Sequence, residues 1–311
     1  MNKEIKSLYR RLRPTEFSEV VGQIHIVKTL ENQIKSGKIS HAYLFCGTRG
    51  TGKTSLARIF AKEIKGEIIE LDAASNNSVD DVRELTEKVK YPPVLGNYKV
   101  YIIDEVHMFS TSAFNSFLKT LEEPPSHSIF VLCTTEPHKL PQTILSRVLR
   151  FDFRPIPSEE LHKFIENTFK KEGVLATDEV IKTLVDKSGG SVRDLLSIAE
   201  VITAYSNKPT MDDVERILGT VSGNKLKELV NAIVIKDVEK IENINKEIFS
   251  QGVNVFGIIK DLLRIIKGMF IEKKDERLLK IFQRFAELEL SIKTSMDQKS
   301  MFEACCYLCM A

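Results

Sequence analysis

The chain has 311 residues, of which 42% are hydrophobic and 28% are charged, close to the usage of ordinary globular proteins. A chain of this length exceeds one typical hydrophobic core and has room for two or three domains. It has no run of the roughly 18 to 20 apolar residues that a membrane helix needs. Its N-terminus, Met1 to Glu4, lacks the apolar stretch of a secretory signal. We therefore expect a cytoplasmic protein that makes no membrane contact.

The net charge of +2 is only mildly basic, well short of the strongly basic balance of a dedicated nucleic-acid-binding domain. Any contact with DNA must therefore use local clusters of charge or several subunits together. One candidate cluster lies at the N-terminus, where a solvated helix turn is the alternative explanation: Lys3, Lys6, Arg10, Arg11 and Arg13.

In the first half of the chain, short apolar runs alternate with helix-like stretches, as in a parallel sheet wrapped by helices. The runs that read as strands are Ala42–Cys46, Ile68–Leu71, Val100–Ile103, Ile129–Cys133 and Arg150–Phe153. The third and fourth are apolar throughout, which is typical of strands buried on both faces, whereas the fifth alternates as an edge strand does. The predicted fold class is therefore α/β, and a helix from about Lys53 to Ile64 follows the first strand.

The character of the chain changes after Arg154–Pro157, because two prolines in three residues interrupt both helix and sheet. Every later segment has helical periodicity, with helix starts at Ser158, Thr177, Ser191 and Thr210. The helical pattern pauses near residues 219–222 and then resumes to the end. We therefore predict three domains, residues 1–156, 157–220 and 221–311.

The third predicted domain has an apolar stripe at helical spacing that exceeds what a lone solvent-facing helix needs. The stripe comprises Val255, Ile258, Ile259, Leu262, Leu263 and Ile266. Both a core within the domain and a surface that joins subunits would use such a stripe.

The five cysteines are all expected to pack as small hydrophobic residues. Cys46 and Cys133 lie in apolar strand runs. Cys305, Cys306 and Cys309 lie in an apolar helical pattern, with no second cysteine pair or partnered histidines nearby. Because a tetrahedral zinc site needs about four such ligands, we predict no zinc.

Residues Gly47-Thr48-Arg49-Gly50-Thr51-Gly52-Lys53-Thr54 match the phosphate-binding loop GxxxxGK[ST] at every fixed position. Its glycines let the backbone wrap a phosphate and direct N–H groups at it, at the positive end of the following helix. Lys53 is expected to reach the β- and γ-phosphates of ATP, and Thr54 to offer its hydroxyl to Mg²⁺. Ser55 follows in the first turn. The loop comes after a predicted strand and opens a predicted helix, which is the context this motif requires.

A pair of acids supports the same site. Asp104 and Glu105 stand where the apolar run Val100–Ile103 ends. In ATPases with this loop, an acid at the end of such a strand holds Mg²⁺ and its neighbour orients or deprotonates the attacking water. We assign Asp104 to the metal and Glu105 to the water. His107 is expected to have a structural or signalling role rather than a catalytic one.

Several further segments resemble the gamma/tau subunits of the bacterial DNA polymerase III clamp loader, which are AAA+ ATPases. Asp104–Met108 resembles their Walker B segment, and Cys133–Pro137 their sensor 1 strand end. The other similar segments are Leu118–Pro125, the finger segment Thr143–Arg147, the sensor 2 segment Gly189–Asp194, and the adenine-side lead-in of Tyr9–Pro14 with Phe17–Gln23. The resemblance extends, with falling specificity, over the whole chain.

The resemblance implies an AAA+ nucleotide-binding domain, a small helical lid domain and a helical collar domain. It also implies roles for single residues. Thr134 would sense the γ-phosphate, Arg193 would reach the same nucleotide from the lid, and Arg147 would act as an arginine finger on the ATP of a neighbouring subunit. The adenine side would be formed by Arg13, Pro14, Val20 and Val21.

The sequence departs from the family in two places. Val148 replaces the cysteine that usually follows the finger arginine, which keeps an apolar contact and leaves Arg147 in place. Between Ala61 and Glu70 there is no cysteine, where typical members have a four-cysteine zinc module. Tau-type members also continue into a tail that contacts other replication proteins. Because the chain ends at Ala311, we expect only the motor and oligomerisation parts.

The function that the resemblance implies is an ATP-driven motor subunit that loads a sliding clamp onto primer–template DNA. Its partners would be delta-like and delta-prime-like subunits, the clamp and DNA. Ser75–Ser78 with Arg83 would be one DNA contact, with a purely structural loop as an equal alternative. Two other functions stay open: a structural subunit that does not hydrolyse ATP, and a homo-hexameric AAA+ ATPase of branch migration or replication maintenance. The complete phosphate site argues against the first, and the Arg147 segment against the second.

Overall fold

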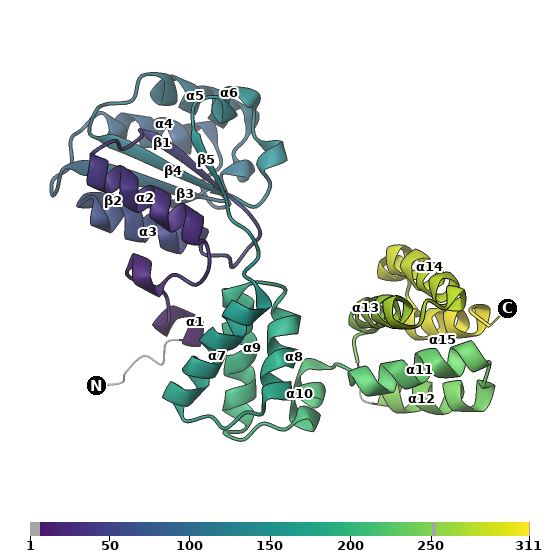
Figure 1. Ribbon diagram of the computed structural model, residues 1–311. Helices are drawn as coiled ribbons and strands as arrows, with labels where there is room; N and C mark the ends of the chain where they lie inside the picture. The colour runs from purple at the N-terminus through teal and green to yellow at the C-terminus, as the bar shows by residue number, and fades with distance from the viewer. Residues whose placement is uncertain (1–6, 251–252, 311) are drawn as a thin grey trace. The chain divides into compact units, whose positions relative to one another are not determined.

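The computed structural model describes residues 7–250 and 253–310 (Figure 1). Contacts divide the chain into two compact units, Met1–Asn207 and Lys208–Ala311. The boundary between the units falls inside the predicted 157–220 domain, so the three-domain division stays a prediction.

The first unit is built on a five-stranded parallel sheet with the order β2-β3-β4-β1-β5. The strands are β1 (Ala42–Cys46), β2 (Gly66–Asp72), β3 (Tyr98–Asp104), β4 (Ser128–Thr134) and β5 (Leu149–Asp152). Each predicted strand is present, and β5 lies at the edge as its alternating pattern indicates. The central strands β1 and β4 are buried along their whole length, because helices cover both faces of the sheet.

Helices cover both faces of the sheet (Figure 1), and each face carries a separate hydrophobic core. On one face, α2 (Ile24–Ser36) and α3 (Lys53–Glu63) contribute side chains such as Ile26 and Phe60. On the other face lie α4 (Val79–Val89), α5 (Thr111–Glu122) and α6 (Gln142–Leu145). Aromatic pairs pack these helices against the sheet. The Phe117 ring of α5 contacts the Phe130 ring of β4 edge-on, with 5.2 Å between the ring centres.

Helices α7 (Ser158–Glu172), α8 (Asp178–Ser188) and α9 (Val192–Tyr205) complete the first unit, with the short α1 (Leu8–Arg11) packed on α9. The predicted caps are confirmed at Thr177 and Ser191, whose side chains accept hydrogen bonds from the N–H groups of Val180 and Asp194. The predicted start at Ser158 is also confirmed, since Ser158 is the first residue of α7, but there Pro157 occupies the cap position and makes no side-chain bond. Within the described residues of this unit, 3₁₀ turns at Phe17–Glu19, Val106–Met108 and Pro137–Lys139 connect the elements.

The second unit is helical throughout its described residues. Its helices are α10 (Met211–Leu218), α11 (Gly223–Ile235), α12 (Val238–Ser250), α13 (Val255–Lys273), α14 (Glu276–Ser291) and α15 (Gln298–Leu308), with a 3₁₀ turn at Ile292–Thr294. Thr210 caps α10 in a reciprocal capping box with Asp213, as its sequence predicts.

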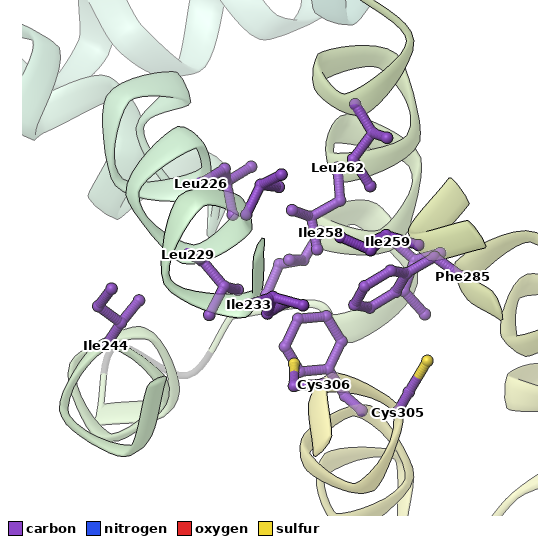
Figure 2. Close-up of a cluster of buried hydrophobic side chains, with 14 of the residues drawn as sticks. Leu226, Leu229, Ile233, Ile244, Ile258, Ile259, Leu262, Phe285, Cys305 and Cys306 are labelled. Atoms are coloured by element: carbon purple, nitrogen blue, oxygen red, sulfur yellow. The ribbon is translucent and has the colours of Figure 1, made fainter. Parts of the chain in front are cut away.

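The predicted apolar stripe of α13 lies in the core of this second unit (Figure 2). Ile258, Ile259 and Leu262 are fully buried against α11, α14 and α15. Cys305 and Cys306 belong to the same core, which confirms their packing role, and Cys309 is partly buried beside it. The stripe is therefore used within the unit and is not in itself evidence for a subunit interface.

One polar side chain interrupts this core. Asn245 is only 2% exposed, and neither its amide oxygen nor its nitrogen has an oxygen or nitrogen partner in the described part of the chain. The neighbouring thiol of Cys306 offers no more than a weak sulfur contact. A buried polar group left unpaired costs about 1–3 kcal/mol.

We expect Asn245→Leu, which keeps the branching of the side chain, to raise the free energy of unfolding by about 1–2 kcal/mol. Urea unfolding of the two proteins would measure the change. Asn231→Leu, at an exposed position of α11, is the control and should leave stability within about 0.5 kcal/mol. Destabilisation by Asn245→Leu would show that the amide is satisfied or that the core cannot accept the extra methyl groups.

No helix in the part of the chain described here is long and apolar enough to cross a membrane.

Candidate nucleotide-binding site

A cavity of about 860 Å³ opens in the first unit beside the phosphate-binding loop. It lies at the carboxyl ends of the parallel strands, where α/β sheets bind their ligands. It brings together most of the predicted site, including Lys53, Thr54, Asp104 and Glu105 from the loop and β3, and Arg193 from α9. The other predicted residues that line it are Arg13, Pro14, Val20, Val21, Arg49, Gly50, Thr51, Gly52 and Ser55.

Two glycines of the loop are required by close approach of other chain segments. A Cβ on Gly47 would lie 2.4 Å from the backbone oxygen of Phe153. Gly50 has a φ of +73°, and a Cβ there would lie 1.9 Å from Ser191 Oγ. Gly50 also accepts a hydrogen bond from the Val192 N–H at 3.1 Å. The loop is therefore in direct contact with the N-terminus of α9.

Lys53 is held inside the loop. Its ammonium group donates hydrogen bonds to the carbonyl oxygens of Gly47 at 2.8 Å and Thr48 at 3.0 Å. Gly47 and Thr48 therefore hold the lysine rather than line the cavity. The residue is only 6% exposed, and burial lowers the pKa of the ammonium. A phosphate entering the loop would supply the negative charge that this buried cation lacks.

Thr54 and Asp104 form the predicted metal-binding pair. The Thr54 hydroxyl donates to Asp104 Oδ2 at 2.8 Å. The described residues contain no group of three or more His, Cys, Asp or Glu side chains that could hold a metal. Mg²⁺ keeps several waters and commonly takes one or two protein oxygens plus substrate phosphates, so this hydroxyl and carboxylate fit it when a nucleotide completes the coordination.

Glu105 lies at the sharp end of β3, with a left-handed φ of +49°. Its N–H donates to Asp104 Oδ1 at 3.1 Å, and its Oε2 accepts from the Thr135 hydroxyl at 3.1 Å. Thr134 is fully buried at the end of β4 and does not line the cavity. It contacts His107, whose Nδ1 lies 3.1 Å from the Thr134 hydroxyl oxygen.

The α9 side of the cavity is tied to the loop by charge as well as by backbone. Arg49 and Asp194 form an ion pair at 2.9 Å. The Arg193 guanidinium lies 5.3 Å from the centre of the Tyr9 ring, a cation–π distance. The ion pair with the loop and the contact with Tyr9 thus hold α9, which carries Arg193, over the phosphate end of the cavity.

Arg13 anchors the N-terminal lead-in. Its Nε donates to Ser55 Oγ at 3.1 Å, and burial lowers the pKa of its guanidinium, with the nearby charge of Arg58 as a further cause. Some lining residues were not among the predicted ones: Tyr9, Arg10, Leu12, Glu19, Arg58, Glu70, Leu71, Asp72, Ile102, Phe164, Val192 and Leu196. For Tyr9, Arg10 and Leu12 the signal was present, since they belong to the lead-in segment.

Arg147 lies away from the cavity of its own chain. Its guanidinium donates to Glu122 Oε1 at 2.7 Å and to the carbonyl oxygen of Thr143 at 2.7 Å. This position fits a residue that acts on another subunit. Of the proposed DNA contacts, Lys3 and Lys6 lie outside the described residues, and Ser78 caps α4 through a capping box with Asp81.

The sequence of the chain matches those of known proteins. A profile described as "DNA polymerase III, delta subunit" matches residues 22–77 and 67–157. The DNA polymerase III subunit gamma of Buchnera aphidicola subsp. Schizaphis graminum is 33% identical, over 98% of this chain and 91% of its own length. The chain belongs to the gamma/tau family of DNA polymerase III subunits. Among the members of this family, the tau subunits of Bacillus subtilis and Escherichia coli are 40% and 37% identical.

The match covers only part of the tau subunits. It spans 92% of this chain and 56% of the B. subtilis protein, and 83% of this chain and 44% of the E. coli protein. The chain therefore spans about half the length of the curated tau relatives it matches. Among solved structures, the Thermotoga maritima RuvB Holliday junction branch migration motor aligns with a TM-score of 0.57 at 20% identity, over 81% of this chain and 90% of that one. A likeness at this identity shows the AAA+ fold that gamma/tau subunits share with RuvB.

Proposed function

We propose that the chain is an ATP-driven motor subunit of a clamp loader, which places a sliding clamp on primed DNA. The observation that carries the proposal is the complete phosphate site of a gamma/tau family member. Lys53 is buried in the loop, and Thr54 is bonded to Asp104 at the edge of a nucleotide-sized cavity. The proposed role in replication would take place in the bacterial cytoplasm.

The proposed cofactors are ATP and Mg²⁺. The loop N–H groups and Lys53 would hold the phosphates, and Thr54 and Asp104 would hold the metal, which neutralises charge on the transferred phosphoryl group. Glu105 would accept the proton of the attacking water. Arg13, Pro14, Val20 and Val21 would surround the adenine.

The site would be completed by a second subunit. Arg147, outside its own cavity, would stabilise charge on the ATP of a neighbour, while Arg193 would report on the nucleotide of its own chain. Residues 1–156, 157–220 and 221–311 would act as motor, lid and collar. Delta-like and delta-prime-like subunits would complete the ring.

The energetic basis of loading is differential affinity. ATP bound between subunits would favour the assembly that grips and opens the clamp, and hydrolysis would remove that preference. Contacts with primer–template DNA would be mainly to phosphates, so DNA affinity should fall steeply with salt.

The alternative is a homo-hexameric branch-migration ATPase. Only the similarity of fold to RuvB supports it, because RuvB is just 20% identical to this chain and a shared fold does not imply a shared function. A structural subunit that does not hydrolyse ATP would have no need for the intact contacts of Lys53, Thr54 and Asp104.

Steady-state ATP turnover tests the proposal. The chain would be mixed with delta and delta-prime subunits, with and without sliding clamp and primed DNA, and Lys53→Ala would serve as the inactive control. Turnover stimulated severalfold by clamp plus DNA, and abolished by Lys53→Ala, is the expected result. Turnover that is indifferent to the clamp would favour the homo-hexameric ATPase, and no turnover in any mixture would favour the structural subunit.

A further inference from the structure

His107 is a buried titratable side chain beside the site that the proposed hydrolysis does not use. His107 lies in the 3₁₀ turn that follows Glu105, and its side chain is only 7% exposed. Both of its ring nitrogens have polar partners. Nδ1 lies 3.1 Å from Thr134 Oγ1 and 3.4 Å from Glu105 Oε2, and Nε2 lies 3.1 Å from Glu136 Oε2. One ring thus touches residues from the ends of both β3 and β4.

The backbone explains how His107 reaches this position. Glu105 adopts the left-handed conformation, which is uncommon for a residue with a Cβ, and Met108 N–H closes the turn on the Glu105 carbonyl at 2.8 Å. The buried Val106 anchors the turn to the core. Because β3 and β4 are parallel neighbours, the turn returns the ring toward the end of β4.

His107 restricts Thr134, the residue expected to sense the γ-phosphate. The Thr134 hydroxyl oxygen already accepts a hydrogen bond from the Glu136 N–H at 3.0 Å. Its own proton is therefore free to point toward Nδ1 of His107, at 3.1 Å. A hydroxyl held between a backbone N–H and an imidazole has one preferred rotamer.

The same ring restricts Glu105. Oε2 of Glu105 is held by the Thr135 hydroxyl and faces His107, whereas Oε1 has no hydrogen-bond partner among the described residues. One oxygen of the carboxylate is thus fixed, and the other remains available to a water molecule. That is the arrangement which a water-orienting carboxylate needs.

Glu136 holds the far side of the ring. Hydrogen bonding from Lys139 is the main cause that lowers the pKa of Glu136, with the positive field of His107 as a smaller cause. Oε2 of Glu136 lies 3.1 Å from Nε2, so this carboxylate lies against the side of the ring away from Thr134 and Glu105. The ring thus bridges the ends of β3 and β4.

We infer that His107 is a positioning residue that ties Glu105, the carboxylate proposed to orient the water, to Thr134 at the end of β4. This inference rests on the proposed function, because it assigns His107 to the hydrolysis that the proposal describes. His107 acts only through its neighbours, and it does not line the cavity.

The test uses the reconstituted clamp loader with clamp and primed DNA, and measures kcat and KM for ATP. His107→Ala is expected to lower kcat about 10- to 100-fold, as misplacement of a reacting group does, with KM within about twofold. His107→Asn places an amide near the position of Nδ1 and should recover part of the loss. His107→Gln reaches mainly toward Glu136 and should recover less.

His138→Ala is the matched control. That histidine also faces Glu136, at 3.9 Å, but it is 74% exposed and has no contact with Thr134 or Glu105. The control should leave kcat unchanged. Thermal unfolding and binding of a non-hydrolysable ATP analogue would be measured for each variant, since a merely structural histidine would change both together with kcat.

Three results would overturn the inference: an unchanged kcat in His107→Ala, a Gln variant more active than the Asn variant, or a loss of kcat matched by loss of folding and nucleotide binding. A different result would contradict the proposed function. If the wild-type assembly shows no turnover, or if its turnover does not respond to the clamp, then the motor assignment is wrong whatever His107 does.

Discussion

Replacing Arg147 by alanine is expected to lower ATP turnover by the assembled complex about 10³- to 10⁵-fold, the range measured for arginine fingers. Nucleotide binding by the isolated chain should not change, because Arg147 does not line its own cavity. Turnover by the complex should therefore fall while nucleotide binding by the isolated chain stays the same. A residue that served its own site would affect both.

The contacts of Arg147 explain why a large effect is expected at a small cost in stability. The guanidinium is about one third exposed and is held by Glu122 and the Thr143 carbonyl. With a further hydrogen bond from Nη1 to Ser146 Oγ at 3.2 Å, these contacts use at most three of its five N–H donors, so others remain for the oxygens of a γ-phosphate. The partly exposed ion pair is worth less than about 1 kcal/mol, so the variant should fold.

Turnover would be measured in complexes that contain the variant chain, and nucleotide affinity by titration of a fluorescent ATP analogue. Arg150→Ala is the control, since Arg150 is an exposed arginine of the neighbouring β5 that pairs with Asp152 at 2.7 Å. It should leave turnover within about twofold. If Arg147→Ala retained full activity in the complex, the shared-site mechanism would be excluded.

The centre of the sheet could be predicted from sequence because its inner strands β1, β3 and β4 are buried on both faces. The runs Val100–Ile103 and Ile129–Cys133 are apolar at every position, and the structure places them at the centre of strands β3 and β4. Strand ends were less certain. β2 extends from Gly66 to Asp72, beyond the predicted Ile68–Leu71, because its terminal residues pair with β3 as far as Asp104.

The phosphate end of the site was also predictable, because its chemistry fixes residue types at fixed spacing. The other walls were not. Phe164 and Leu196 line the cavity from α7 and α9, yet in the sequence each is one more apolar residue of an amphipathic helix. The contacts of Arg49 with Asp194 and of Arg147 with Glu122 join residues far apart in the chain. No local pattern indicates such pairs.

Glu105→Gln is the second substitution for which a large effect is expected. The amide keeps the size of the side chain and can still accept from the Thr135 hydroxyl, but it cannot take a proton from water. Loss of a general base lowers turnover by about 10²- to 10⁴-fold. Single-turnover hydrolysis of ATP by the assembled complex would measure this step apart from product release.

The same variant should bind Mg·ATP at least as well as the wild type, because the bond from Thr54 to Asp104 does not involve Glu105. Glu19→Gln is the matched control, since Glu19 also lines the cavity but accepts its hydrogen bonds from Thr15. Equal losses in both variants would mean that the total negative charge of the cavity matters rather than the position of one carboxylate. A loss confined to Glu105→Gln, with nucleotide binding intact, would identify the residue that activates water, because removal of a metal ligand would weaken Mg·ATP binding as well.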